Sequence, residues 1–360
     1  MPGLSDTIAR LNAMRAMRSA APNTGRTRLT PLAGFGQNPG ALVAKTYVPD
    51  DLKAAAALVV VLHGCTQDAE TYDRGSGWSQ IADEQGLALL YPEQVRGNNA
   101  NLCFNWFEPG DTRRGSGEAA SIHQMVEAMI AAHNLDRSHV FVTGLSAGGA
   151  MTSVMLATYP DVFASGAIIA GLPYGAAASM PEAFVQMRGA SASVASVRAA
   201  SGHGGPWPTV SIWHGDADLV VDASNAAAIV AQWRAVHGVG DAAARNERGD
   251  GYARRVWTDG GGREVIDCNI VYGLGHGTPL ATRGAEGCGV AGAHMLEAGV
   301  LSTRAITRFW GLETRPVRAS VPGPAANDVP CSFVPSDTGY AGAGPGRVIE
   351  DALRAAGLMR

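Results

Sequence analysis

The segment from His139 to Thr158 contains the residue that the sequence marks most clearly for chemistry. A short apolar strand leads into Gly144-Leu145-Ser146-Ala147-Gly148, and a helix follows. A serine in such a turn needs a strained backbone, and glycines two residues on either side remove the Cβ atoms that would collide there. We therefore expect Ser146 to be a nucleophile, exposed at the carboxyl edge of a sheet, rather than a small residue in an ordinary turn.

The chemistry of a serine nucleophile requires a base that takes its proton and a carboxylate that holds this base. In this kind of sheet the partners follow the serine in the order acid, then histidine, on loops at strand ends. One later loop carries Asp216, Asp218 and Asp222, and the next carries His276. We favour Asp218 and His276, because Asp216 is nearer the strand end and Asp222 resembles the cap of the following helix.

Three other histidines compete with His276 for the role of base. His63 directly precedes a presumed oxyanion loop and is expected to be structural. His214 opens the aspartate loop, where packing or hydrogen bonding is expected, and His294 follows a glycine-rich stretch. Two backbone N–H groups are expected to stabilise the oxyanion, those of Ala147 at the start of its helix and Cys65 after the first central strand.

The elements that must position these residues are apolar strands alternating with amphipathic helices. Such continuous apolar runs are typical of central parallel strands buried on both faces. The alternation predicts an α/β sheet with right-handed crossovers. The expected strands are Leu58–Leu62, Leu87–Tyr91 (stopped by Pro92), Val140–Thr143, Phe163–Ala170 and Thr209–Trp213, with an edge strand at Lys45–Val48 and a hairpin of Ala253–Thr258 and Val265–Tyr272.

The helices show their inner faces by spacing. Ser116 is an expected N-cap for a helix whose apolar residues recur every three or four positions, namely Ile122, Met125, Val126, Met129 and Ile130. A second helix is expected from Asn225 to Val236, and shorter ones over Pro181–Arg188, Arg304–Trp310 and Val348–Leu358.

Composition bounds the remaining possibilities. The chain has 360 residues, of which 46% are hydrophobic and 17% charged, and a formal net charge of −4. These values fit one α/β domain with extensions, or two small domains, and give no sign of nucleic-acid binding. No apolar run is long enough for a membrane span. Residues 1–20 lack the apolar core of a signal peptide and are expected to form a weakly amphipathic helix.

The cysteines and one long insertion carry separate expectations. The 5 cysteines show no metal-ligand spacing. If the protein is exported, we expect a Cys268–Cys288 disulfide that restrains His276, with Cys65–Cys103 as a second possible pair. Residues 171–208 are expected to form a cap-like insertion beside the site, with a simple surface excursion as the alternative. Its apolar side chains, with Trp106 at the mouth, are expected to line an acyl pocket rather than only to pack on the sheet: Leu172, Tyr174, Met180, Phe184, Met187 and Trp207.

Seven segments together carry a resemblance to a known family. They are LHGCTQDA (62–69), CFNWF (103–107), GSGEAASI (115–122), VTGLSAGGAM (142–151), YPDVFASGAIIAGLPYG (159–175), WHGDADLVV (213–221) and GLGHGTPL (273–280). In this order they resemble the esterase / polyhydroxybutyrate (PHB) depolymerase family, an α/β-hydrolase group related to feruloyl and acetylxylan esterases. The resemblance implies ester hydrolysis through an acyl-enzyme, with Ser146, Asp218 and His276 at the triad positions and with no metal or organic cofactor.

The resemblance also frames the domains, the substrate and the compartment. We expect an extension over 1–40, an α/β-hydrolase domain over 41–312, and a Pro- and Gly-rich tail over 313–360. The tail is shorter than the linker and polymer-adsorbing domain of extracellular depolymerases, which favours short 3-hydroxyalkanoate esters or oligomers over insoluble granules. Feruloyl or acetylxylan ester hydrolysis, or acyl transfer to an alcohol, are the alternatives. The resemblance implies an extracellular location, while the N-terminus leaves the cytoplasm open; the oligomeric state is not predicted.

Overall fold

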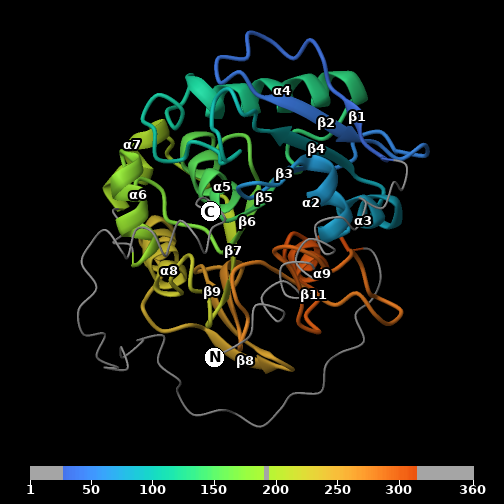
Figure 1. Ribbon diagram of the computed structural model, residues 1–360. Helices are drawn as coiled ribbons and strands as arrows, with labels where there is room; N and C mark the ends of the chain where they lie inside the picture. The colour runs from blue at the N-terminus through green and yellow to red at the C-terminus, as the bar shows by residue number, and fades with distance from the viewer. Residues whose placement is uncertain (1–26, 190–193, 314–360) are drawn as a thin grey trace, which may run out of the picture.

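The apolar runs form the centre of a ten-stranded sheet in the computed structural model, which describes residues 27–189 and 194–313 (Figure 1). Neighbouring strands from β4 to β10 run parallel, as the sequence predicts, and those at both ends are antiparallel. In sheet order the strands are β1 (Thr30–Pro31), β2 (Val43–Tyr47), β4 (Ala88–Glu93), β3 (Leu58–Leu62), β5 (Val140–Leu145), β6 (Ser165–Ile169), β7 (Thr209–Gly215), β10 (Glu264–Val271), β9 (Tyr252–Thr258) and β8 (Arg245–Gly249).

Helices cover both faces of this sheet, so each central strand is buried on two sides. In β3, Leu58, Val60 and Leu62 pack into one apolar cluster, whereas Val59 and Val61 pack into the other. The first cluster includes residues of α4 (Gly117–His133), α5 (Ala147–Thr158) and α8 (Ser224–His237). The second includes residues of α2 (Ala69–Ser76), α3 (Trp78–Gln85) and α9 (Ser302–Phe309), which lie on the opposite side of the sheet in Figure 1.

The expected helix α4 begins where its sequence indicates. Ser116 is the N-cap, and Asn134 closes the helix in the left-handed region with φ 50°. The apolar residues at helical spacing are all buried against the sheet, which confirms the predicted inner face: Ile122, Met125, Val126, Met129 and Ile130. The helix thereby presents its first turn, with Glu118, toward the loop that carries Trp106.

Several elements differ from the prediction. The strand β4 does not stop before Pro92, because this residue pairs with Ala44 of β2 while β3 pairs with β4 only as far as Leu90. Proline is tolerated where no neighbouring strand needs its missing N–H. Strand β1 adds to the sheet within the segment 27–40, for which the sequence indicates only a lead-in. The helices expected over 1–20 and 348–358 lie outside the described residues.

The insertion over 171–208 contains two helices, α6 (Met180–Met187) and α7 (Val194–Ser201). Ser179 caps α6 by accepting a hydrogen bond from the N–H of Glu182, and Pro181 occupies its first turn. A short two-stranded sheet of β11 (Thr278–Leu280) and β12 (Met295–Glu297) follows the loop of His276. Residues that follow β3, β5 and β7 line one cavity together with residues of α6.

At the two edges of the described sheet the strands are short or charged. All residues of β8, Arg-Asn-Glu-Arg-Gly, are exposed. At the other edge, β1 has two residues, one of them Pro31, which has no N–H to offer a further strand.

Candidate active site

Ser146 lies between β5 and α5 with a backbone that few residues adopt, φ 57° and ψ −117°. Both flanking glycines are required by close packing. A Cβ on Gly144 would lie 2.4 Å from the carbonyl oxygen of Gly148, and a Cβ on Gly148 would lie 2.3 Å from that of Leu62. These distances confirm the expectation that the glycines permit the turn, and the strained conformation holds the serine at the edge of the sheet.

Asp218 and His276 are brought together from loops that follow β7 and β10. The Nδ1 of His276 lies 2.7 Å from Oδ2 of Asp218. The other oxygen, Oδ1, accepts hydrogen bonds from the N–H groups of Val220 at 2.8 Å and Val221 at 2.9 Å. Burial alone would raise the pKa of Asp218, but hydrogen bonds from His214 and His276 outweigh it and hold the pKa well below its usual range. Asp218 is therefore an anion that fixes the orientation of His276.

The other two candidate acids, Asp216 and Asp222, form hydrogen bonds to backbone N–H groups instead of to His276. The Oδ1 of Asp216 accepts a hydrogen bond from the N–H of Gly273 at 2.6 Å, which ties the aspartate loop to the histidine loop. Asp222 accepts one from the N–H of Ser224 at 2.9 Å, at the start of α8. Both carboxylates therefore support the local backbone, and Asp218 is the one that contacts His276.

The competing histidines also have defined contacts. His214 donates through Nε2 to the carbonyl oxygen of Val221 at 2.8 Å, and the same nitrogen lies 3.5 Å from Oδ2 of Asp218. His63 is buried, which lowers its pKa, and its Nδ1 lies 2.8 Å from the carbonyl oxygen of its neighbour Gly64. The Nδ1 of His294 lies 3.1 Å from the carbonyl oxygen of His276. These contacts are structural, in agreement with the roles that the sequence indicates for His63 and His214.

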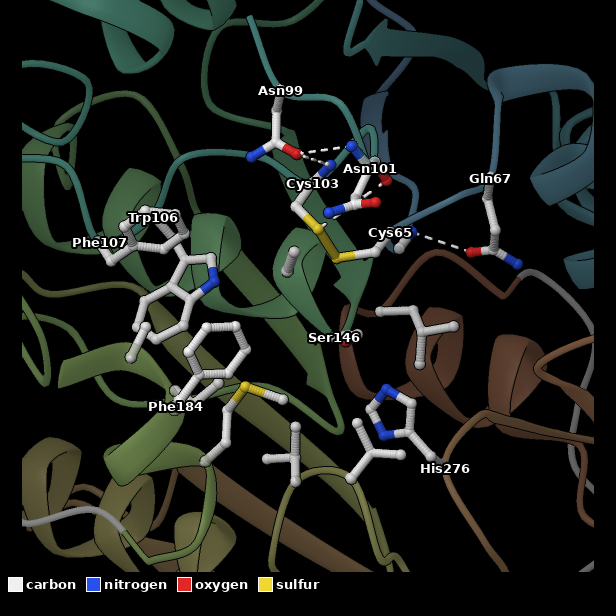
Figure 2. Close-up of a pocket in the computed structure, with 18 of the residues that line it drawn as sticks. Cys65, Gln67, Asn99, Asn101, Cys103, Trp106, Phe107, Ser146, Phe184 and His276 are labelled. Atoms are coloured by element: carbon white, nitrogen blue, oxygen red, sulfur yellow. Dashed lines mark hydrogen bonds between the residues drawn. A yellow bond between two sulfur atoms is a disulfide. The ribbon is translucent and has the colours of Figure 1, made fainter. Parts of the chain in front are cut away.

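One cavity of about 250 Å³ contains both Ser146 and His276 in its lining. Figure 2 shows the His276 ring beside Ser146, with Trp106, Phe107 and Phe184 across the cavity. Ala147 and Cys65, whose N–H groups are the expected oxyanion donors, line the same cavity. Ala147 is the first residue of α5, so its N–H has no acceptor within the helix. The cavity therefore combines a hydroxyl, an imidazole and candidate oxyanion donors.

The apolar wall of this cavity comes from the insertion and from the loop after β4. Four of the expected residues contribute to it, with Trp106, which is only 8% exposed: Leu172, Met180, Phe184 and Met187. Tyr174 and Trp207 do not line it, and for these two the packing alternative is correct. The backbone of Tyr174 exchanges two hydrogen bonds with the side chain of Gln232 on α8, and Trp207 packs against His203.

The disulfide beside the cavity is Cys65–Cys103, the second of the two expected pairs. The expected Cys268–Cys288 bond is wrong. Both residues are buried, but Cys268 on β10 packs into one apolar cluster and Cys288 into the other, so the sheet stands between them. Cys268 and Cys288 therefore flank His276 in the sequence but do not lie close to each other in the fold.

Sequence reasoning missed residues that shape the polar side of the cavity. Gln67 accepts a hydrogen bond from the N–H of Gly64 at 2.9 Å and so braces the turn that carries Cys65. Asn99 and Asn101 also line the cavity near the disulfide (Figure 2). Gln67 lies in the motif LHGCTQDA. However, a hydrogen bond between a side chain and the backbone of a nearby turn produces no periodic pattern in the sequence that could predict it.

Residues 27–189 and 194–313 show neither a metal site nor a membrane-spanning helix. No group of three or more His, Cys, Asp and Glu side chains within these ranges is arranged to hold a metal ion. Nor does any helix in the same ranges have the length and apolar character needed to cross a membrane.

The chain is similar to a known family, to proteins of that family and to a solved structure. A family model described as esterase PHB depolymerase matches residues 43–255. Poly(3-hydroxyalkanoate) depolymerase C of Paucimonas lemoignei is 45% identical over 294 residues, covering 79% of this chain and 70% of that protein. An acetylxylan esterase of Coprinopsis cinerea is 32% identical over 273 residues, 72% and 71% of the two chains. The structure of an acetyl xylan esterase from Aspergillus awamori superimposes with a TM-score of 0.66 and 25% identity, over 79% of this chain and 99% of that one.

Proposed function

Because the chain belongs to the esterase PHB depolymerase family and is a carboxylic ester hydrolase with the α/β-hydrolase fold, we propose that it cleaves short 3-hydroxyalkanoate esters or oligomers. The main observation in support of the mechanism is that Ser146 and His276 line one cavity and that His276 is hydrogen-bonded to Asp218. The substrate class is supported by the 45% identity to a protein named poly(3-hydroxyalkanoate) depolymerase C.

In this proposal Ser146 attacks the ester carbonyl while His276 takes the hydroxyl proton and then passes it to the leaving alcohol. Asp218 holds the proton on Nδ1, which leaves Nε2 free to act as the base, and it stabilises the imidazolium. The N–H groups of Ala147 and Cys65 stabilise the oxyanion of the tetrahedral intermediate. Water then attacks the acyl-enzyme by the same route, which releases the acid.

The apolar wall is proposed to bind the acyl part of the substrate, with Trp106 as a contact. Trp106 stands edge-on to Phe107 with ring centroids 5.5 Å apart, so the two rings form a rigid apolar surface. The cavity of about 250 Å³ is lined mainly by apolar side chains, as an acyl-binding site requires.

The disulfide supports an oxidising compartment for this enzyme, and we propose an extracellular location. Disulfides persist in secreted proteins and are rare where thiols are kept reduced. Peptide mapping of the native protein under non-reducing conditions checks this, since free thiols at Cys65 and Cys103 would exclude it.

The test is a substrate panel with one inactive variant. Purified protein is assayed on p-nitrophenyl acetate, butyrate and octanoate, 3-hydroxybutyrate oligomers, acetylated xylo-oligosaccharides and methyl ferulate. We expect the highest kcat/KM on hydroxybutyrate oligomers, and a loss of about 10⁴-fold in kcat for a folded Ser146→Ala variant. A folded variant with wild-type turnover contradicts the mechanism.

Acetylxylan ester hydrolysis is the second candidate, because the acetyl xylan esterase structure matches this chain with a TM-score of 0.66. Preference for acetylated xylo-oligosaccharides in the same panel would favour it. Ester products that appear when alcohol acceptors are added would instead indicate acyl transfer.

A further inference from the structure

The first turn of α4 holds a glutamate that the proposed mechanism does not use. Glu118, from the segment GSGEAASI, has no exposed surface. Its Oε2 accepts a hydrogen bond from the N–H of Asn105 at 2.8 Å, and its Oε1 accepts one from Nε2 of Gln94 at 2.5 Å. Burying a carboxyl group costs free energy unless hydrogen bonds compensate for the lost water, and both oxygens of Glu118 accept such bonds.

These hydrogen bonds reach the two segments that flank the candidate oxyanion hole. The Nε2 of Gln94 also donates to the carbonyl oxygen of Cys103 at 3.0 Å. The backbone N–H of Gln94 donates to Nε2 of His63 at 3.1 Å, which assigns the His63 proton to Nδ1, bonded to Gly64. Gln94 and Glu118 thus hold the Cys103–Asn105 segment on one side and the His63–Gly64 turn on the other.

The disulfide joins the same two segments. Cys65 follows Gly64 directly, and its sulfur is bonded to that of Cys103. The next residue, Thr66, donates its N–H to the carbonyl oxygen of Asn101 at 2.7 Å. The disulfide therefore restrains the backbone of Cys65, including its N–H. Hydrogen bonds from Gln94 to Cys103 and from Asn105 to Glu118 fix the other end of this disulfide.

We propose that Glu118 and Gln94 form a positioning unit that aims the Cys65 N–H at the oxyanion through the Cys65–Cys103 disulfide. The inference rests on the proposed function, in which this N–H stabilises the tetrahedral intermediate. Neither side chain touches the substrate. The unit acts through the segment that bears Cys103, so its loss weakens stabilisation of the transition state more than binding of the ester.

The local hydrogen bonds explain why residue 118 is a carboxylic acid. The Oε1 of Gln94 accepts hydrogen bonds from the N–H of Val95 at 3.0 Å and from Nδ2 of Asn98 at 2.9 Å, which fixes its amide orientation. The Gln94 NH₂ group and the Asn105 N–H are then both donors, and the two carboxyl oxygens can accept from both, the hydroxyl oxygen of the neutral acid through its remaining lone pair. A glutamine at position 118 has one oxygen and would turn its own NH₂ toward one of these donors.

The test compares two glutamates close together in sequence. Glu118→Gln changes the buried group, and Glu108→Gln changes an exposed one that does not line the cavity. With p-nitrophenyl butyrate we expect Glu118→Gln to lower kcat at least tenfold with KM changed less than threefold, against a loss of 10²- to 10³-fold when an entire oxyanion donor is removed. Glu108→Gln should match the wild type.

A double-mutant cycle tests the route through the disulfide. If the unit acts through Cys103, Glu118→Gln should have much less effect in a Cys65→Ser/Cys103→Ser background than in the wild type. Equal fold-losses in both backgrounds, or a wild-type kcat for folded Glu118→Gln, would overturn the proposal. If Glu118→Gln does not fold, Gln94→Met provides the same comparison. Activity in folded Ser146→Ala would instead overturn the proposed function itself.

Discussion

Replacement of Asp218 by asparagine gives the sharpest test of how His276 is prepared for catalysis. Both carboxylate oxygens are occupied: Oδ1 accepts the N–H groups of Val220 and Val221, and Oδ2 faces Nδ1 of His276 at 2.7 Å. The side-chain oxygen of an asparagine at position 218 must accept the hydrogen bonds of the Val220 and Val221 N–H groups. The opposite orientation would place its NH₂ group, a donor, against these two donors. Its NH₂ group therefore faces Nδ1 and selects the tautomer with the proton on Nε2.

This tautomer cannot take the proton of Ser146, which sets the magnitude of the effect. Loss of the correct tautomer in the serine–histidine–aspartate arrangement lowers kcat by about 10⁴-fold, or roughly 5.4 kcal/mol in activation free energy. Two other variants remove the same charge from the same loop. Asp216→Asn and Asp222→Asn can each keep the oxygen that accepts from Gly273 or Ser224, so we expect losses below about tenfold.

The assay is steady-state hydrolysis of p-nitrophenyl butyrate by the three asparagine variants, with Ser146→Ala as the lower limit. Circular dichroism and the melting temperature establish that each variant is folded. The reasoning is refuted if folded Asp218→Asn stays within tenfold of the wild type, or if Asp222→Asn alone shows the large loss.

Two further predictions follow from the pocket and from Glu118. Trp106→Ala should raise the ratio of kcat/KM for octanoate over acetate esters by about tenfold, because it opens the wall of the cavity; an unchanged ratio would remove Trp106 from the site. Burial, and to a lesser degree the charge of Asp111, raises the pKa of Glu118 from 4.5 to about 8, against the hydrogen bonds of Asn105 and Gln94. The folded state thus keeps a proton that the unfolded chain releases, so this stabilisation is complete below pH 4.5 and is lost as the pH rises through about 8. The free energy of unfolding is measured in urea from pH 5 to 9 for the wild type and for Glu118→Gln. As the pH rises, the wild type should lose stability relative to the variant, by an amount on the order of 5 kcal/mol at most. A difference that stays constant with pH would show that Glu118 does not change its protonation.

The centre of the fold could be predicted because its signals are local. The apolar runs of β3 and β5 are buried on both faces, and the glycines around Ser146 are where backbone contacts forbid a Cβ. The helices α2 and α3 were missed, since each has eight residues and Gly77 separates them in the left-handed region with φ 74°. A glycine between two short polar segments is typical of a turn, so the sequence there gives no clear sign of two helices.

The candidate site was predictable for a different reason. Parallel strands bring their carboxyl ends to one edge of the sheet, so loops after β3, β5, β7 and β10 had to meet there. What failed depends on packing between distant segments. The pairing of Cys268 required knowledge of which sheet face each thiol occupies, and the network of Glu118 joins residues from three separate segments.

The exposed strand β8 and the two-residue strand β1 have a consequence for the behaviour of the protein at high concentration. Free sheet edges are templates on which a second chain can add a strand, and this is a common origin of aggregation. Charged side chains along β8 disfavour such pairing, and Pro31 offers no N–H to an incoming strand. Engineering that trims residues 27–31 or replaces Arg245, Glu247 and Arg248 with apolar residues would therefore remove the protection against self-association, even though every residue around Ser146 stayed in place.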